Sequence, residues 1–384
     1  MRTESMERTG HHKNRMINIE LLRLLAMMMV VSLHYLSKGG LLEELTGPLS
    51  AKGHLAWILE SFSIAAVDVY VLISGYFLVE TGFRSRRVIS LVLQVVFYAC
   101  LIPVALTAFK VPIGEITFYQ LLQYIFPMNM LHYWFVSAYV LMFLFTPVLN
   151  AAVHAMKKKQ LQIVIVMLLL VESLSKTVIP VRLELDNEGY DVYWFMAVYL
   201  IAAYIRLYGI PFLEKKEGER NKAALYYIGL SFAIYGWTML IRAAFLVTGK
   251  FEDFMKSAYG YNHLLTIGAA VTLFYAFKNL EIKRGDSRFA RFVCKVSPCS
   301  FGVYLLHEHI NIRYEWPFWL GADKCYSALS LLGYWLTAIV IVMVVGLTVD
   351  YIRNLLFQGA GSILAGGKID QALKKVDNKA NGTA

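Results

Sequence analysis

The sequence is poor in charged residues. Of its 384 residues only 17% are Asp, Glu, Lys or Arg, whereas 58% are hydrophobic and the mean hydropathy is +0.53. A water-soluble domain typically carries about 25% charged residues. The composition therefore excludes an ordinary soluble globular protein and predicts an integral membrane protein.

Cysteine is also scarce. The chain has four cysteines, of which Cys294 and Cys299 are the closest pair. No neighbouring His or Cys completes a zinc-binding set around them. We predict no metal site and no required disulfide.

The sequence lacks a signal-peptide cleavage pattern, an internal repeat and a separate soluble domain. Its first apolar run, residues 16–37, is too long for the hydrophobic part of a signal peptide, and no small-x-small motif follows it. We therefore expect no cleaved signal peptide. The predicted organisation is a cytoplasmic segment, 1–15, one membrane domain, 16–355, and a polar, Gly-rich cytoplasmic tail, 356–384, that is loosely ordered.

Long apolar runs make up most of the chain. A bilayer core about 30 Å thick requires roughly 20 helical residues. Ten segments reach or approach this length: 16–37, 55–80, 88–109, 131–153, 161–179, 190–209, 223–248, 262–279, 299–316 and 327–352. The predicted fold is thus all-α, a polytopic bundle of about ten transmembrane helices. The ninth segment is the least apolar because it contains His307, Glu308, His309 and Arg313.

The distribution of Lys and Arg predicts the orientation of the bundle. If the ten helices alternate, 24 of the 37 basic residues lie on the side of the N-terminus, 7 lie on the other side and 6 fall within the spans. Cytoplasmic loops are enriched in Lys and Arg, so both termini are expected in the cytoplasm of a multi-pass cell-membrane protein. The net charge of +10 is then explained without a nucleic-acid partner. Between the third and fourth spans, "ITFYQLLQYIF" at 116–126 predicts an amphipathic helix that is either interfacial or re-entrant.

The first apolar run carries three ionisable residues, Glu20, Arg23 and His34. Eleven residues separate Arg23 from His34, which corresponds to three helical turns plus about 20°, so both lie on one face ~16 Å apart. Glu20 can pair with Arg23 at a spacing of three. Arg23 near the inner end could simply snorkel, and His34 could be an interfacial histidine. Their shared face nevertheless favours a common polar cavity.

The second apolar run contains "VDVYVLISGYFLVE", residues 67–80. Asp68 falls near the membrane centre, where a lone carboxylate requires a partner. We expect a guanidinium or imidazole from the first or ninth helix. Ser74 could provide close helix packing, and Ser74, Tyr76 or Arg23 could donate a hydrogen bond to an oxyanion.

Arg84 and Arg87 stand three residues apart in "GFRSRRV" at the expected cytoplasmic edge. Two guanidiniums at this spacing can clamp phosphate groups. Taken alone, the pair is better explained as ordinary positive-inside charge.

Four further residues are candidates for a cavity lining or a substrate contact. His307 and Glu308 fall near mid-membrane if the ninth segment spans, although they could also form a hydrogen bond that only holds the bundle together. Trp134 at the outer interface could stack on a sugar ring or belong to the aromatic belt. Arg242 could bind an acceptor or snorkel.

Taken together, these motifs resemble the integral-membrane acyltransferase type 3 family, whose members have about ten helices and O-acylate cell-envelope glycans. The resemblance covers roughly residues 15–355. The motifs that carry it are Arg23-x10-His34, "VDVYVLISGYFL", the Arg84-x-x-Arg87 pair, "HYWFV" at the start of the fourth helix and "SFGVYLLH" in the ninth.

The resemblance implies a donor, acetyl-CoA or another acyl-CoA, presented from the cytoplasm with its phosphates held by Arg84 and Arg87. It implies a carbohydrate hydroxyl as acceptor, and it makes His34 the catalytic imidazole with Arg23 as its essential partner. Many relatives carry a Glu in a Trp-Ser-Leu-type motif at the start of the fourth helix, where this chain has "WFVSAY". This departure favours a resemblance to the relatives that act on bacterial exopolysaccharides.

A membrane transporter of a glycan, lipid or acylated product is the alternative reading. A transporter should have polar residues along a continuous path, and many have paired halves, which this sequence lacks. For the enzyme, we expect one tunnel that joins an inner donor site at Arg23 to an outer acceptor site at His34.

Overall fold

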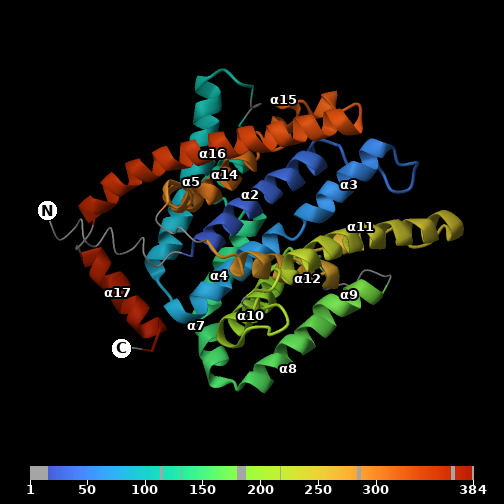
Figure 1. Ribbon diagram of the computed structural model, residues 1–384. Helices are drawn as coiled ribbons and strands as arrows, with labels where there is room; N and C mark the ends of the chain where they lie inside the picture. Colours follow the sequence, from blue (N-terminus) through green and yellow to red (C-terminus); the bar gives the residue numbers. More distant parts are fainter. Residues whose placement is uncertain are drawn as a thin grey trace.

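The computed structural model describes residues 16–112, 116–130, 132–179, 187–216, 218–282, 287–364 and 368–382, which form helices and turns without a β-strand. In chain order the main helices are α2 (Ile17–Lys38), α3 (Ala51–Ser63), α4 (Ala66–Thr81), α5 (Ser85–Ala108), α6 (Phe118–Ile125), α7 (Trp134–Ala155), α8 (Lys158–Leu168), α9 (Ser175–Val178), α10 (Val192–Tyr208), α11 (Lys222–Thr248), α12 (Leu264–Lys278), α13 (Arg288–Val296), α14 (Ser300–His307), α15 (Trp316–Trp319), α16 (Ala328–Leu364) and α17 (Lys368–Ala380) (Figure 1). A π-helical turn, Leu169–Leu174, joins α8 to α9.

The predicted all-α membrane bundle is confirmed. Within the described residues, eight helical segments are long and apolar enough to cross a membrane, and α10 is a shorter apolar helix. The helix α6 also confirms the amphipathic helix expected at 116–126, and it begins with a capping box made by Thr117 and Gln120. The orientation of the bundle remains a prediction.

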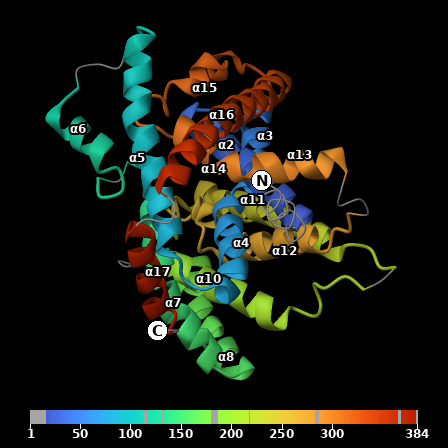
Figure 2. The same cartoon turned by 90° about the vertical axis from the view of Figure 1, so that its left-hand side faces the viewer.

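Helix α2 lies at the centre of the bundle. It packs against α3, α4, α12, α14 and α16 (Figures 1 and 2). In the most apolar stretch of α2, 67% of the residues are buried inside the protein. The corresponding share is 17% in α11 and 17% in the α8–α9 segment. The peripheral helices therefore present apolar side chains outward, as a lipid-facing surface requires, while α2 forms an inner wall.

The second predicted span is divided into two helices. The helix expected over 55–80 ends at Ser63, and α4 begins at Ala66. Just before the break, Ser61 and Ser63 donate hydrogen bonds to the carbonyls of Ile58 and Leu59. Such bonds from serine side chains compete with helix hydrogen bonds and bend helices. Asp68 consequently lies in the first turn of α4. The two helices together cover Ala51–Thr81, a segment that is long and apolar enough to cross a membrane.

The bounds predicted for the ninth span, 299–316, are also wrong. The apolar helical segment covers Arg288–His307, and the chain then turns toward α15. Beyond Glu308, side chains replace helical hydrogen bonds. His132 Nε2 accepts from the Ile310 amide at 3.2 Å, and His309 Nδ1 accepts from the Asn311 amide at 3.2 Å. His307 and Glu308 therefore lie at one end of this segment rather than in its middle.

The C-terminal part of the chain is more ordered than predicted. Helix α16 continues to Leu364, and α17 docks against the turn between α4 and α5 (Figure 2). Asn381 accepts from the Phe83 amide at 2.7 Å and donates to the Phe83 carbonyl at 2.9 Å. Asp377 accepts from the Ser85 amide at 2.7 Å. The tail is therefore attached to the membrane domain by specific polar contacts.

Candidate functional site

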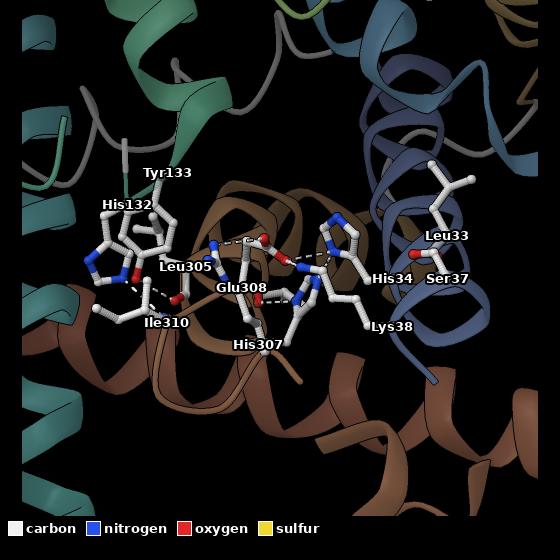
Figure 3. A network of polar contacts seen from close by, with 12 residues as sticks. Leu33, His34, Ser37, Lys38, His132, Tyr133, Leu305, His307, Glu308 and Ile310 are labelled. Carbon is white, nitrogen blue, oxygen red and sulfur yellow. Dashed lines mark hydrogen bonds and ion pairs between the residues drawn. The ribbon is translucent and has the colours of Figure 1, made fainter. Parts of the chain in front are cut away.

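Two histidines meet where α2 and α14 end. His34 lies in the last turns of α2, and its Nδ1 atom is 2.9 Å from Nε2 of His307, the last residue of α14 (Figure 3). The contact between α2 and α14 brings together residues 273 positions apart. His34 is partly accessible, with 18% of its side chain exposed, whereas His307 is buried.

The hydrogen-bond partners determine which ring nitrogens carry hydrogen. His307 Nδ1 lies 2.6 Å from the carbonyl of Val303, which can only accept, so this nitrogen donates. In a neutral ring its Nε2 atom is then an acceptor for the Nδ1 hydrogen of His34. A neutral His34 in this arrangement has an unprotonated Nε2, which is the atom that can accept a proton from a substrate.

Glu308 is surrounded by cationic and polar groups. Its carboxylate lies 3.2 Å from His34 Nδ1 and contacts the ammonium of Lys38 (Figure 3). It also lies 3.8 Å from the guanidinium of Arg313. Only 7% of the Glu308 side chain is exposed. A buried carboxylate needs such partners, because an isolated charge there is costly. Lys38 was not among the predicted site residues, although it follows His34 by one helical turn and so shares its face.

These residues also form a set of possible metal ligands, which the sequence did not predict. Ligand atoms of His34, His307 and Glu308 lie within 4.8 Å of one another. Histidine nitrogens with a carboxylate oxygen are typical zinc ligands. Lys38 and Arg313, however, already lie against the same carboxylate. A metal ion could bind here only after displacing the ammonium of Lys38.

A second group of aromatic residues holds the segment after α14 in place. The rings of His132 and Tyr133 stack at 4.2 Å, and the Tyr133 hydroxyl donates to the carbonyl of Leu305 at 2.8 Å (Figure 3). Burial lowers the pKa of His132 to about 4 and that of His309 to about 3. Both rings are therefore neutral at pH 7, and they position the chain through hydrogen bonds rather than charge.

A separate cavity lies at the opposite end of α2. It has a volume of about 270 Å³, and its lining includes Arg23, Ser74, Phe77, Arg87 and Tyr139. Residues from α2, α4, α5 and α7 thus meet around it.

Both Arg23 and Ser74 are oriented by hydrogen bonds. Arg23 pairs with Glu20 at 2.8 Å, as the spacing predicted, and Glu20 also accepts from the Ser297 hydroxyl. Ser74 accepts from the Tyr139 hydroxyl at 3.1 Å.

The two arginines of the Arg84-x-x-Arg87 motif have different positions. Arg87 lines the cavity that contains Arg23. Arg84 is the exposed N-cap residue of α5 and is not among the lining residues. The structure therefore joins Arg87 to Arg23, whereas Arg84 lies outside this cavity.

Aromatic rings separate the inner cavity from the outer histidines. The ring of Tyr70 lies 6.4 Å from that of Phe135, Phe135 lies 5.9 Å from Tyr304, and Tyr304 lies 6.4 Å from His34. The Tyr70 hydroxyl donates to the carbonyl of Arg23 at 2.8 Å. His34 is not among the residues that line the Arg23 cavity. Among the described residues these rings form an aromatic partition between the two sites, and the single tunnel that we expected stays a prediction.

Asp68 has a partner other than the expected one. Its Oδ1 atom accepts from the indole nitrogen of Trp194 on α10 at 2.9 Å, and its Oδ2 atom has no hydrogen-bond partner among the described residues. The expectation of a guanidinium or imidazole from the first or ninth helix is wrong. α10 packs closely on α4 and supplies the donor instead.

Three other predicted residues lie in different surroundings. The Tyr76 hydroxyl accepts from Arg206 at 3.2 Å. The Trp134 ring contacts that of Tyr190 at 4.5 Å and belongs to an aromatic cluster. Arg242 donates to the carbonyls of Leu45 and Gly47 at 3.0 and 2.7 Å, and so holds the loop after α2.

The fold and these two sites define a class of protein: a polytopic membrane protein with an imidazole–carboxylate cluster at one end of its central helix and an arginine-lined cavity at the other. A family model described as an acyltransferase domain matches residues 16–352. The chain belongs to this family, the acyltransferase type 3 family, and is an acyltransferase that transfers groups other than aminoacyl groups. Searches of curated proteins and of solved structures returned no match.

Proposed function

We propose that the protein is a membrane O-acyltransferase that moves an acyl group, in our proposal an acetyl group, from a cytoplasmic acyl-CoA to a hydroxyl of an extracytoplasmic or lipid-linked glycan. The observation that carries the proposal is the position of His34. Its Nδ1 atom is engaged by His307 and Glu308, so Nε2 is left to accept a proton. We place the protein in the cell membrane with α2 retained, since removing this central helix would open the core.

The cavity around Arg23 and Arg87 supports a donor site on the cytoplasmic side. Guanidiniums bind phosphate oxygens through charge-assisted hydrogen bonds. The pantetheine arm of an acyl-CoA is long and thin, and it would extend from this cavity along α2. Because the rings of Tyr70, Phe135 and Tyr304 lie on that route, these rings must move for the thioester to reach His34.

The transfer step follows from the chemistry of a sugar hydroxyl, which is a weak nucleophile at neutral pH. His34 Nε2 takes the hydroxyl proton as the oxygen attacks the thioester carbonyl carbon. The carbonyl oxygen becomes an oxyanion, which the ammonium of Lys38 could stabilise, because Lys38 contacts the same Glu308 carboxylate as His34. When the oxyanion collapses, the C–S bond breaks, and the CoA thiolate leaves as a thiol after taking the proton held by His34. His34 could instead carry the acyl group covalently, which would make it the nucleophile.

The acceptor is proposed to be a bacterial polysaccharide, such as an exopolysaccharide, that approaches from the outer face. The alternative is a transporter of a glycan, lipid or acylated product. The aromatic partition disfavours the transporter, because it interrupts the continuous polar path that transport needs.

The direct test uses the purified full-length protein in lipid nanodiscs. Acetyl-CoA labelled in its acetyl group is added with a panel of glycan acceptors, and glycan-bound label is measured. We expect label on at least one glycan, and loss of this label after mild alkaline hydrolysis of the ester. If no glycan is labelled, and a His34→Ala variant still supports the cellular phenotype, the enzyme proposal is wrong.

An Arg87→Ala variant should have a higher KM for acyl-CoA. Loss of one charge-assisted hydrogen bond to a phosphate is expected to raise KM about tenfold or more, with a smaller effect on kcat. Initial rates at varied donor concentration measure this change. Arg291→Ala, an exposed basic residue on the same predicted side, is the control. An equal rise in KM for both variants would mean that only the overall charge matters.

A further inference from the structure

A large apolar groove lies on the membrane-facing side of the bundle, away from both sites described above. It has a volume of about 900 Å³. Helices α8 and α11 form its walls, and they contribute Ile165 and Leu230, respectively. Helices α10 and α12 form its floor, and they contribute Ile201 and Ile267. Because α8 and α11 are mostly exposed, this groove opens toward the hydrocarbon region of the bilayer.

One end of the groove is polar and basic. Gln162 and Tyr204 line this end and are joined by a hydrogen bond of 2.7 Å. Lys158 precedes Gln162 by one turn of α8, and Lys222 precedes the lining residue Tyr226 by one turn of α11. Residues four apart share a helix face. The two lysines therefore flank the same end of the groove from opposite walls.

Both lysines are available to an anion. The Lys158 ammonium lies 5.5 Å from the centre of the Tyr208 ring, a weak contact that leaves its hydrogens free. Lys222 lies 3.6 Å from Glu219, and 58% of its side chain is exposed. An exposed ion pair of this kind contributes little, so a phosphate could replace the carboxylate.

The distance from the flanking lysine to the last lining residue of the α8 wall matches one leaflet. From Lys158 to the lining residue Leu169 the helix rises ~16 Å, about half of a bilayer core of roughly 30 Å. At Leu169 the wall changes from α-helix to the π-helical turn, a feature that is frequent at functional sites. The groove thus extends from the basic end to near the middle of the membrane.

We propose that this groove binds one anionic glycerophospholipid of the cytoplasmic leaflet, with its phosphate between Lys158 and Lys222 and an acyl chain along α12. Charge complementarity at one end and apolar lining over the rest favour this occupant. The site is independent of the proposed acyl transfer.

Glycine substitutions provide a matched test. Gly229 lines the groove, and a Cβ atom added there meets no atom within 4 Å. Gly236 lies two turns further along α11 and does not line the groove, and a Cβ atom added there also meets no atom within 4 Å. Gly229→Leu should therefore fill the groove without disturbing the fold, and Gly236→Leu is its control. The full-length protein is titrated in detergent with phosphatidylglycerol or with phosphatidylcholine of the same chains, and bound lipid is counted by native mass spectrometry.

We expect the wild type and Gly236→Leu to retain one phosphatidylglycerol, and Gly229→Leu to lose it. A Lys158→Gln/Lys222→Gln double variant should bind phosphatidylglycerol about tenfold or more weakly, with its binding of phosphatidylcholine unchanged. Retention in Gly229→Leu, or equal binding of the two lipids by the wild type, would overturn the proposal. So would displacement of phosphatidylglycerol by a polyprenyl phosphate at equal concentration.

A second inference concerns α17 and rests on the proposed acyl-CoA site. The Asp377 carboxylate accepts the amide hydrogen of Ser85, the first residue of α5, two positions before Arg87. Helix N-termini favour carboxylates and phosphates alike. Asp370 also lies 3.6 Å from the Arg86 guanidinium. We infer that α17 competes with the donor phosphates for the start of α5 and so lowers the affinity of the resting protein for acyl-CoA.

An Asp377→Ala variant tests this competition. We expect the KM for acyl-CoA to fall about two- to fivefold, the effect of one carboxylate at a helix N-terminus, with kcat unchanged. Lys375→Ala, an exposed residue on the same helix, is the control. Binding of CoA itself, followed by calorimetry, and limited trypsin digestion of α17 provide readouts besides activity.

The outcomes separate this inference from the proposed function. If trypsin shows that α17 is released in Asp377→Ala, but CoA binds as in the wild type, the competition is disproved while the donor site stands. If neither protein binds CoA, the proposed donor site itself is wrong.

Discussion

A His34→Ala variant is expected to lose acyl transfer by about 10²- to 10⁴-fold, the range that a general base contributes. The loss should appear in kcat, because His34 acts on the acceptor proton in the transition state and lies outside the cavity proposed for the donor phosphates. The KM for acyl-CoA should change little. The nanodisc assay with labelled acetyl-CoA measures both constants.

His54→Ala is the matched control for this experiment. His54 lies on α3, and its ring contacts the hydroxyl of Tyr235 at 2.6 Å, away from the histidine cluster. We expect it to transfer label at the wild-type rate. A His34→Ala rate within threefold of the wild type, in protein that elutes as a single folded species, would exclude His34 as base or acyl carrier.

The helices were predictable because apolar length determines them. Most of the ten expected segments agree with described helices within a few residues, since a run of about 20 apolar residues forms a helix almost regardless of its neighbours. The exceptions depend on polar side chains. Ser61 and Ser63 end α3 through local hydrogen bonds, and His132, in the bend just before α7, holds the Ile310 amide. A hydropathy pattern contains neither interaction.

The candidate site was predictable only where its residues share one helix. The spacing of Glu20 and Arg23 along the helix predicted their ion pair. The polar character of His307 and Glu308 identified them as candidates for a cavity lining. What the sequence could not supply is how α14 and α2 are placed relative to each other, which puts His307 against His34. The partition between the two ends depends in the same way on rings from α4, α7 and α14.

The largest loss of stability is expected from Asp350→Ala. Asp350, on α16, is fully buried and accepts hydrogen bonds from Gln94 and Tyr98 of α5 at 2.9 Å each. It also pairs with Arg353 at 2.7 Å and accepts from Asn354 at 3.1 Å. Removing the carboxylate leaves the buried guanidinium of Arg353 without its counter-ion, which costs about 3–5 kcal/mol. Equilibrium unfolding in mixed micelles measures the loss.

The double variant Asp350→Ala/Arg353→Leu separates this explanation from a general packing defect. When both charges are absent, no uncompensated guanidinium is left, so the double variant should be more stable than Asp350→Ala alone. Asp323→Ala, at an exposed position, should change the free energy of unfolding by no more than about 0.5 kcal/mol. If the double variant is instead less stable than the single one, the hydrogen bonds and volume of the cluster, rather than its charge balance, hold α16 against α5.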